Sequence, residues 1–526
     1  MTVPGGPPFA TPDDETRDPW AVQLPEPRDP AEAGGSVLPA YPAPAPRRRR
    51  GLVTMVAAGV AVAVAAGGGL AWAAFNGDTG NQPERHLPRT TAALVKVDLD
   101  PSGPQKIEAA RFLSKFPDSG TSQDSDLRKV VYDRLSESGD RVPPWSEVRG
   151  WIGDRAGVAM VADADAPVVV LQVTDEAKAR ASLGSSAVKL PAGSFTVADG
   201  WATISDTKAH LDAVTGGLAQ GTLADDSAFR HDVDALGDAG VLSGWADFSR
   251  LSSLAQRLGG GLAAGGLLGG GLPGLAGLDA APGAASKQRL AMTARFTGGN
   301  AELVVRTFGG TPPTVPAEAG AAAAALPRNT VAALAVSGGG STVAEQWKSL
   351  RQRLGGAADG GIAAAQRDTG LHLPGDLVAL LGRRFAIAVG APAGAGEPVV
   401  GVRGASDDPG LGAALDRLLQ LTDRSGALAL ERRNVPGGYV LATSRQEAQA
   451  LSAGGDLGAT DAFRDAVPGS DKAFAVAYVD VQHISASYGS MIGQEAAGAV
   501  SALRAVGLSA TATDDGAELT VRVTTR

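Results

Sequence analysis

Leu87-Pro88-Arg89-Thr90-Thr91 recurs later in the chain as Leu326-Pro327-Arg328-Asn329-Thr330. Each copy leads directly into a short apolar run with the composition of a buried β-strand, residues 92–97 in the first copy and 331–336 in the second. A recurrence of this kind indicates an internal repeat, and a repeat decides how many domains a chain contains. The sequence therefore predicts two related domains.

Further pairs of similar segments follow in the same order along the two copies. They are 151–155 with 380–384, 228–230 with 462–464, 245–247 with 478–480, and 301–306 with 517–522. The first copy is longer before the last pair, where it carries a Gly- and Leu-rich insert at about 258–286 that we interpret as a surface loop, or alternatively as a lid or a membrane contact. The predicted repeats are 86–310 and 326–526, joined by a Pro- and Ala-rich linker over 311–325.

Hydrophobic patterning gives the class of each copy. In the first copy, helices are expected near 107–116, 126–135, 175–183, 207–215 and 227–236. Strands are expected near 92–99, 157–161, 168–173, 194–197, 201–204, 241–246, 290–296 and 302–306. Asp199-Gly200 is a strong turn pair and predicts the tip of a hairpin. Because tight turns join antiparallel strands and the helices come in groups, the predicted class is α+β, with two homologous copies of a mixed helix and antiparallel-sheet domain.

A charge-free apolar run precedes the repeats and follows four consecutive arginines. Its roughly 25 residues, at about 1.5 Å each, exceed the roughly 30 Å hydrocarbon core of a bilayer. We therefore predict a basic stop and transmembrane helix over 47–75, with the N-terminus cytoplasmic and the C-terminal domains extracytoplasmic. A cleavable signal peptide is the alternative, but the length of the run and of the preceding region favours an uncleaved anchor. The residues that define this anchor are Arg47, Arg48, Arg49, Arg50, Gly51 and Phe75.

Composition limits what the rest of the chain can do. Residues 1–46 are rich in proline and lack an apolar period, which predicts a disordered cytoplasmic tail, and 76–85 read as a polar linker. The net charge of −9, without a basic face in the exported part, argues against nucleic-acid binding. The absence of cysteine excludes disulfides, thiol catalysis and cysteine metal sites.

Three segments of the first copy carry a family resemblance: LPRTTAALVKVDLDPSGPQKIEAARFLSKFP at 87–117, WIGDRAGVAMV at 151–161 and PVVVLQVTDEAKARASL at 167–183. They resemble the bacterial membrane-anchored family catalogued as domain of unknown function 3352. This resemblance implies an anchored, exported protein without an assigned reaction, so it brings no functional residue to this chain.

Asp98 and Asp100 are the only weak candidates for a metal site. They lie two residues apart at the end of a predicted strand, so both carboxylates face one side, where they could bind a divalent cation or act as an acid and base. The second copy has Ser337 and Gly339 at these positions, so the fold itself does not require the acids. A solvated strand end is the alternative.

Two kinds of polar residue are retained in both copies. Asp247 and Asp480 each follow an aromatic strand end and are expected to cap a helix. Arg155 and Arg384 are each expected to close an internal ion pair, with an anionic lipid or glycan group as the alternative partner.

Motifs for catalysis are missing. The Ser205-x-x-Lys208 pattern lacks its partner motifs, and Asp206 and Ser444 are instead expected as helix N-caps. No nucleophile elbow, zinc-binding helix or phosphate loop occurs, and no cofactor is predicted. The sequence thus predicts a single-pass membrane protein, held in the lipid bilayer by one helix, whose non-catalytic domains bind an envelope protein or a small ligand. An envelope hydrolase with dispersed carboxylates and a ligand-free scaffold are the alternatives, and the oligomeric state is open.

Overall fold

The structure is a computed structural model that describes residues 81–100, 103–116, 128–129, 145–185, 193–257, 287–354, 357–391, 399–425, 429–488 and 501–526. The predicted tail, membrane helix, Gly-rich insert and 126–135 helix fall outside these residues, apart from 128 and 129. Among the helices that the structure does describe, none combines the length and the apolar character that a membrane crossing requires.

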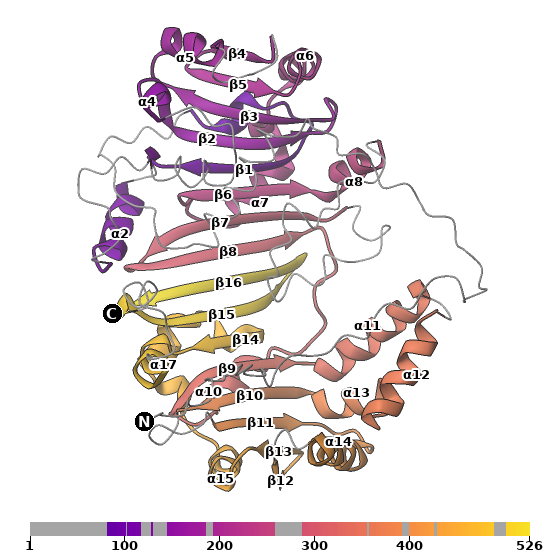
Figure 1. The fold of residues 1–526 in the computed structure, drawn as a ribbon. Helices are drawn as coiled ribbons and strands as arrows, with labels where there is room; N and C mark the ends of the chain where they lie inside the picture. The colour runs from indigo at the N-terminus through magenta and orange to yellow at the C-terminus, as the bar shows by residue number, and fades with distance from the viewer. Residues whose placement is uncertain are drawn as a thin grey trace, which may run out of the picture. The chain divides into compact units, whose positions relative to one another are not determined.

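One antiparallel sheet of 16 strands forms the centre of the described chain (Figure 1). Its strand order is β12-β13-β11-β10-β9-β14-β15-β16-β8-β7-β6-β1-β2-β3-β5-β4, and helices lie on its faces, so the predicted α+β class is confirmed. The first eight strands along the chain are β1 Thr91–Asp98, β2 Ile152–Val161, β3 Ala166–Val173, β4 Phe195–Ala198, β5 Trp201–Ser205, β6 Leu242–Asp247, β7 Arg289–Thr297 and β8 Asn300–Phe308. The other eight are β9 Thr330–Ser337, β10 Arg384–Gly390, β11 Val399–Ala405, β12 Glu431–Val435, β13 Gly438–Ala442, β14 Ala473–Val479, β15 Leu503–Thr513 and β16 Gly516–Thr525.

The two halves of the sheet have the same strand order. Read from the middle outward, the first half runs β8-β7-β6-β1-β2-β3-β5-β4 and the second runs β16-β15-β14-β9-β10-β11-β13-β12. Registers also agree: Asp98 lies opposite Arg155 in the first half, and Ser337 lies opposite Arg384 in the second. The residues that the sequence comparison paired therefore occupy equivalent places in the two halves.

The halves join through β8 and β16, whose pairing is symmetric. Glu302 of β8 lies opposite Arg522 of β16, and Arg306 of β8 lies opposite Glu518 of β16. These residues are the Glu and the Arg of the repeated 301–306 and 517–522 segments. In each pair, the Glu of one segment therefore lies opposite the Arg of the other.

The sheet has two faces, which we name after one residue on each. The Trp245 face is covered by η2, α6, α7, α10, α15 and α16. On it, Phe229 packs edge-on against Trp245 at 5.5 Å between ring centroids, and Phe463 packs against Tyr478 at 5.3 Å. The bounds are η2 Pro83–His86, α6 Lys208–Gly217, α7 Ser227–Asp234, α10 Ala319–Ala324, α15 Arg445–Ala453 and α16 Asp461–Ala466.

The opposite face, the Leu334 face, is covered at its two ends. Helices α4 and α5 pack on the β2, β3 and β5 side chains, whereas α13 and α14 pack on those of β11 and β13. Helix α2 adds a further cover over β7 and β8. The remaining bounds are α2 Gly103–Leu113, α4 Trp145–Val148, α5 Glu176–Leu183, α8 Phe248–Arg257, α11 Gly339–Leu354, α12 Ala357–Thr369, α13 Gly375–Leu381, α14 Leu411–Ser425 and α17 Val481–Tyr488.

Several local predictions hold. The β4–β5 hairpin turns at Asp199 and Gly200, whose φ angles of 53° and 74° are those of a two-residue turn with both residues left-handed. Ser444 caps α15 by accepting a hydrogen bond from the Glu447 N–H. In contrast, Thr207 rather than Asp206 caps α6, because the chain enters the helix one residue later and the Thr207 hydroxyl accepts from the His210 N–H.

Both predicted linkers contain ordered structure. Residues 319–324, placed in a linker by the sequence, form α10, and the fully buried Ala319 and Ala323 pack on the Trp245 face. The small side chains that suggested a linker are instead what allows this helix to lie close to the sheet. In the other linker, residues 83–85 belong to η2, and Glu84 makes a 2.7 Å ion pair with Lys96 of β1.

Candidate functional site

Asp98 and Asp100, the weak metal candidates, meet Arg155. The Arg155 Nε donates to Asp98 Oδ2 at 3.1 Å, and its Nη2 lies 3.7 Å from Asp100 Oδ2. Lys106 of α2 also pairs with Asp100, and the Gln82 amide donates to Asp98 Oδ2 at 2.9 Å. The expected internal ion pair of Arg155 is confirmed, and the cations of the chain itself occupy the two carboxylates. Over the described residues, no cluster of three or more His, Asp or Glu side chains could hold a metal ion.

Arg384 makes the expected ion pair with a partner that the sequence did not indicate. Its Nε lies 3.2 Å from Glu318 Oε2, although without the alignment of a hydrogen bond. Ser337, which replaces Asp98 in the second half, accepts a hydrogen bond at 3.1 Å from the Glu318 N–H. The acid therefore comes from the segment before α10 instead of from the strand, which a comparison of equivalent positions cannot reveal.

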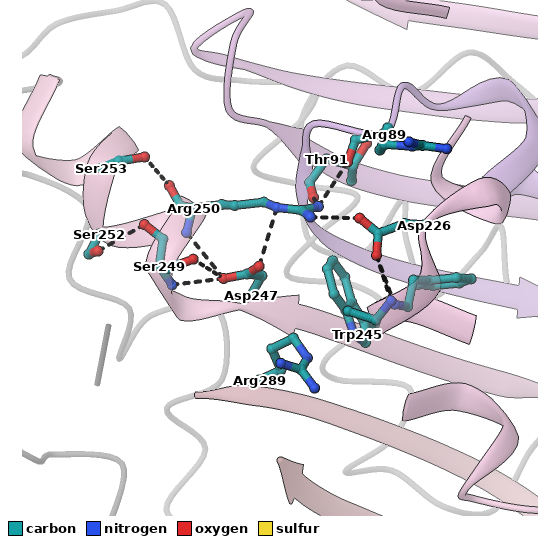
Figure 2. Close-up of polar contacts among 12 residues, drawn as sticks. Arg89, Thr91, Asp226, Trp245, Asp247, Ser249, Arg250, Ser252, Ser253 and Arg289 are labelled. Carbon is teal, nitrogen blue, oxygen red and sulfur yellow. Dashed lines mark hydrogen bonds and ion pairs between the residues drawn. The ribbon is translucent and has the colours of Figure 1, made fainter. Parts of the chain in front are cut away.

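Asp247 and Asp480 both cap helices, as expected. Asp247 Oδ1 accepts from the backbone N–H groups of Ser249 and Arg250 at 2.9 and 3.2 Å, at the start of α8 (Figure 2). Asp480 Oδ1 accepts from the His483 N–H at 2.9 Å, at the start of α17. Each carboxylate thus satisfies helix N–H groups that have no partner within the helix.

Arg250 is the centre of a polar cluster that the sequence analysis missed (Figure 2). Its Nε lies 3.2 Å from Asp247 Oδ2, and its Nη2 donates to Asp226 Oδ2 at 2.6 Å. Its Nη1 donates to the backbone oxygens of Arg89 and Thr91, both at 2.8 Å. The guanidinium thereby ties α8 and the cap of α7 to the repeated segment that precedes β1.

Two buried acids complete this cluster. Burial would raise the pKa of Asp226, but hydrogen bonds from Arg250 and from backbone N–H groups outweigh it and lower the pKa. Asp232 is fully buried and accepts from Trp245 Nε1 at 3.0 Å and from Arg289 Nε at 2.6 Å. Every charge named here has a partner of opposite sign, so the cluster holds elements together and offers no free group for chemistry.

An apolar surface in the middle of the Leu334 face is only partly covered by the fold: Val305, Ala510 and Leu519 form a buried cluster there against which Phe248 of α8 packs, and the rest is half-buried or exposed. A row of directly opposed residues crosses the sheet there without a polar side chain. It consists of Val402, Ile387, Leu334, Ala477, Leu508, Val521, Leu303, Ala294, Leu242, Val97, Ala156 and Leu171.

Two flanking rows extend this surface on the six strands β10, β9, β14, β15, β16 and β8. We call the three rows on these strands the central apolar patch. One flanking row consists of Phe385, Val336, Ala475, Ala510, Leu519 and Val305, and the other of Val389, Ala332, Val479, Val506, Val523 and Ala301.

Much of the central apolar patch is accessible to solvent. Leu334 is 44% exposed and Val479 is 37% exposed, which makes them two of the most exposed large apolar side chains in the described chain. Most of the other members are half-buried, and only Ala510, Leu519 and Val305 are buried. A contiguous apolar surface of this kind marks a place where proteins bind a partner, a membrane or a ligand.

The sequence contained a signal for this surface. A strand with one buried and one solvated face alternates apolar and polar residues, but TVAALAVS in β9 and AFAVAYV in β14 are apolar on both faces. Such a strand is expected to be covered on both sides. The structure covers only the Trp245 side of β9 fully.

Comparisons with protein-family models, with curated proteins and with solved structures find no match to this chain. The family resemblance described from the sequence therefore stays a prediction.

Proposed function

We propose that the exported part of this chain is a non-catalytic binding module that holds an acyl chain of a lipid on the central apolar patch. The observation that supports this most is the patch itself, since Leu334 and its neighbours present three rows without one charged or hydrogen-bonding side chain. A ligand without polar groups along its length fits these three rows.

The dimensions of the patch agree with this ligand. Strands lie about 4.8 Å apart, so the six strands from β10 to β8 span roughly 24 Å. One leaflet of a bilayer contributes about half of the roughly 30 Å hydrocarbon core. A single extended acyl chain can therefore lie across the strands within the patch.

The position of the domains in the cell would supply the ligand. The predicted anchor ends at Phe75, and the described residues begin at Asn81, six residues further on. At no more than about 3.5 Å per residue, this connection keeps the start of the exported part within about 20 Å of the membrane surface. We propose the plasma membrane, with the N-terminus cytoplasmic, as the site of the protein.

We also propose that the 16-stranded sheet arose by duplication of an eight-stranded half. The identical strand orders, the agreeing registers at Arg155 and Arg384, and the reciprocal Glu and Arg contacts of β8 and β16 support this. The patch includes the seam, with β8 from one half and the other five strands from the second, so joining the halves would have extended the binding surface.

Native mass spectrometry of the full chain, released gently from the membranes of the producing cell, tests the proposal. We expect a bound lipid mass that disappears on denaturation. Leu334→Asp should reduce the bound fraction by about tenfold or more, because covering a carboxylate with an acyl chain leaves the charge unpaired. Ile107→Asp on α2 is the control, since Ile107 is 48% exposed but lies outside the patch. A lipid-free protein, or equal loss in both variants, would refute acyl binding at the patch.

A further inference from the structure

A lysine lies at the border of the central apolar patch. Side chains alternate between the two faces along β16, so Thr525 lies on the same face as Val521 and Val523 of the patch. Lys115, in the turn that ends α2, donates from Nζ to Thr525 Oγ1 at 2.7 Å. Its ammonium group therefore lies directly beside the last patch residue of β16.

Packing on both sides of Lys115 determines where its side chain lies. Phe116, the next residue, belongs to an apolar cluster that also includes Ala301 of the patch. Thr525 is 7% exposed, and its hydroxyl donates in turn to the Gly299 backbone oxygen at 3.2 Å. Lys115 itself is half-buried. The fold thus holds a cation next to an apolar surface, with part of its side chain still in contact with solvent.

Lys115 differs from the other basic residues of this segment in its partners. Lys106 pairs with Asp100, and Arg111 pairs with Glu108, whose other oxygen accepts from a backbone N–H. Within the part of the chain that the structure describes, Lys115 makes no ion pair with a carboxylate and donates only to the neutral Thr525 hydroxyl. An ammonium group has three N–H donors, and its hydrogen bonds to anions are the strongest it forms. This position is therefore suited to an anionic group from outside the chain.

We propose that the lipid held on the central apolar patch is anionic, and that its charged head group lies against Lys115 and Thr525. This inference rests on the proposed function and adds the chemical class of the head group. A carboxylate and a phosphate present the same kind of oxygen acceptor to an ammonium group, so both belong to this class.

The place of Lys115 also gives the direction of the acyl chain. From β16 the sheet continues through β15, β14 and β9 to β10, which at about 4.8 Å per strand leaves roughly 19 Å of patch for the chain. Val506 and Val479 lie in line with Val523 along this path, and Val479 is 37% exposed. The accessible part of the patch therefore begins beside the cation.

Two pairs of lipids with the same oleoyl chain separate the head group from the chain. Oleate is compared with its methyl ester, and oleoyl lysophosphatidylglycerol with monooleoylglycerol. Native mass spectrometry of the full chain in a neutral detergent measures the bound fraction of each lipid. We expect the anionic member of at least one pair to bind about fivefold more tightly, the upper range for a partly exposed ion pair. The pair that shows this preference identifies a carboxylate or a phosphate as the head group.

Variants of Lys115 assign the preference to this residue. Lys115→Gln should remove the preference and leave binding of the neutral lipids unchanged, whereas Lys115→Arg should retain it. Arg383→Gln is the matched control, because Arg383 lies at the β10 end of the patch but already has Asp407 Oδ2 at 3.7 Å. This control should keep the preference.

The possible failures are distinguishable. Equal binding of charged and neutral lipids by the wild type, or a preference that survives Lys115→Gln, would overturn the head-group site and leave the acyl-chain proposal standing. An equal loss of neutral and charged lipids in Lys115→Gln would also overturn it, since Lys115 would then act on the fold. Failure of the wild type to bind any of the four lipids would overturn both proposals.

Discussion

Glu302 lies on β8 at the seam between the two halves, where two arginines approach its carboxylate. Arg295 of β7 donates from Nε to Oε1 at 2.9 Å, and Arg522 of β16 donates from Nε to Oε2 at 3.0 Å. Burial would raise the pKa of Glu302, but the hydrogen bonds from Arg522 and Arg295 outweigh it and lower the pKa. The symmetric acid, Glu518, faces Arg306 and is half-buried, so only one of the two equivalent positions became a buried clamp.

Glu302→Gln should destabilise the protein by about 3 kcal/mol at neutral pH, because it leaves the two arginines without their shared anion. Since the native pKa of Glu302 is lowered, its stabilisation is fully present above about pH 4.3 and is lost as the pH falls through the native pKa. Urea unfolding of wild type and variant at several pH values should thus show a difference that shrinks in acid. Glu518→Gln is the matched control and should cost little; equal costs for the two variants would contradict the clamp.

The pKa of Glu447 in α15 is shifted in the opposite direction from that of Glu302. It is 6% exposed, its Oε1 has no hydrogen-bond partner among the described residues, and burial raises its pKa. A raised pKa of an acid means that stability is greatest at low pH and falls as the pH rises from the unfolded value through the native value. Glu447→Gln should remove this loss, so the variant should be more stable than wild type above the native pKa, as measured by urea midpoints from pH 4 to 8. A variant that is less stable than wild type at every pH would show that the charge is compensated.

How far single residues could be predicted depends on where their partners come from. Arg155 was expected to form an ion pair and Asp98 was singled out on its own, yet only the β1–β2 register shows that they are partners. The role of Arg250 could not be predicted from the sequence. Its contacts with Asp226 and with backbone oxygens near β1 connect residues that are far apart in the chain. Local features such as helix caps were predictable, since the cap and the helix are adjacent in sequence.

At the scale of elements, the amino-acid composition gave a wrong prediction for a segment whose small residues serve close packing. Proline and alanine suggested a linker over 311–325, but residues 319–324 form α10, whose Gly320 lies against η8 (Ser470–Lys472). A Cβ added to Gly320 would lie 1.6 Å from the Ser470 carbonyl oxygen, which is possible only if the backbones move apart. Strands and the β4–β5 turn were predictable because their patterns are local.

Gly320→Ala should therefore destabilise the protein by roughly 3 kcal/mol, the cost of forcing atoms into a packed contact. Gly360→Ala in α12 is the control on another helix, because a Cβ there meets no atom within 4 Å. That substitution should stabilise the protein by up to about 1 kcal/mol, since alanine is the better helix former. Thermal unfolding of both variants measures the difference, and a neutral Gly320→Ala would show that α10 is not packed as described.

At the scale of the whole sheet, the repeated segments could be recognised from sequence, but their meeting could not. The 301–306 and 517–522 segments are similar, and the structure brings them together as neighbouring antiparallel strands. Nothing local to either segment indicates this pairing. Nor could the strand patterns alone show that helices leave much of the central apolar patch accessible, since that depends on where the helices lie.

The central claim is that the patch holds an acyl chain, and photo-crosslinking tests it most directly. Cells that produce the full chain would be supplied with a fatty acid carrying a diazirine on its chain, irradiated, and the adducts mapped by peptide mass spectrometry. The account predicts adducts on β9, β14 and β15, within 330–337, 473–479 and 503–513, that are lost in Leu334→Asp. Adducts confined to α11 or to the Trp245 face, or none above the Leu334→Asp background, would contradict it.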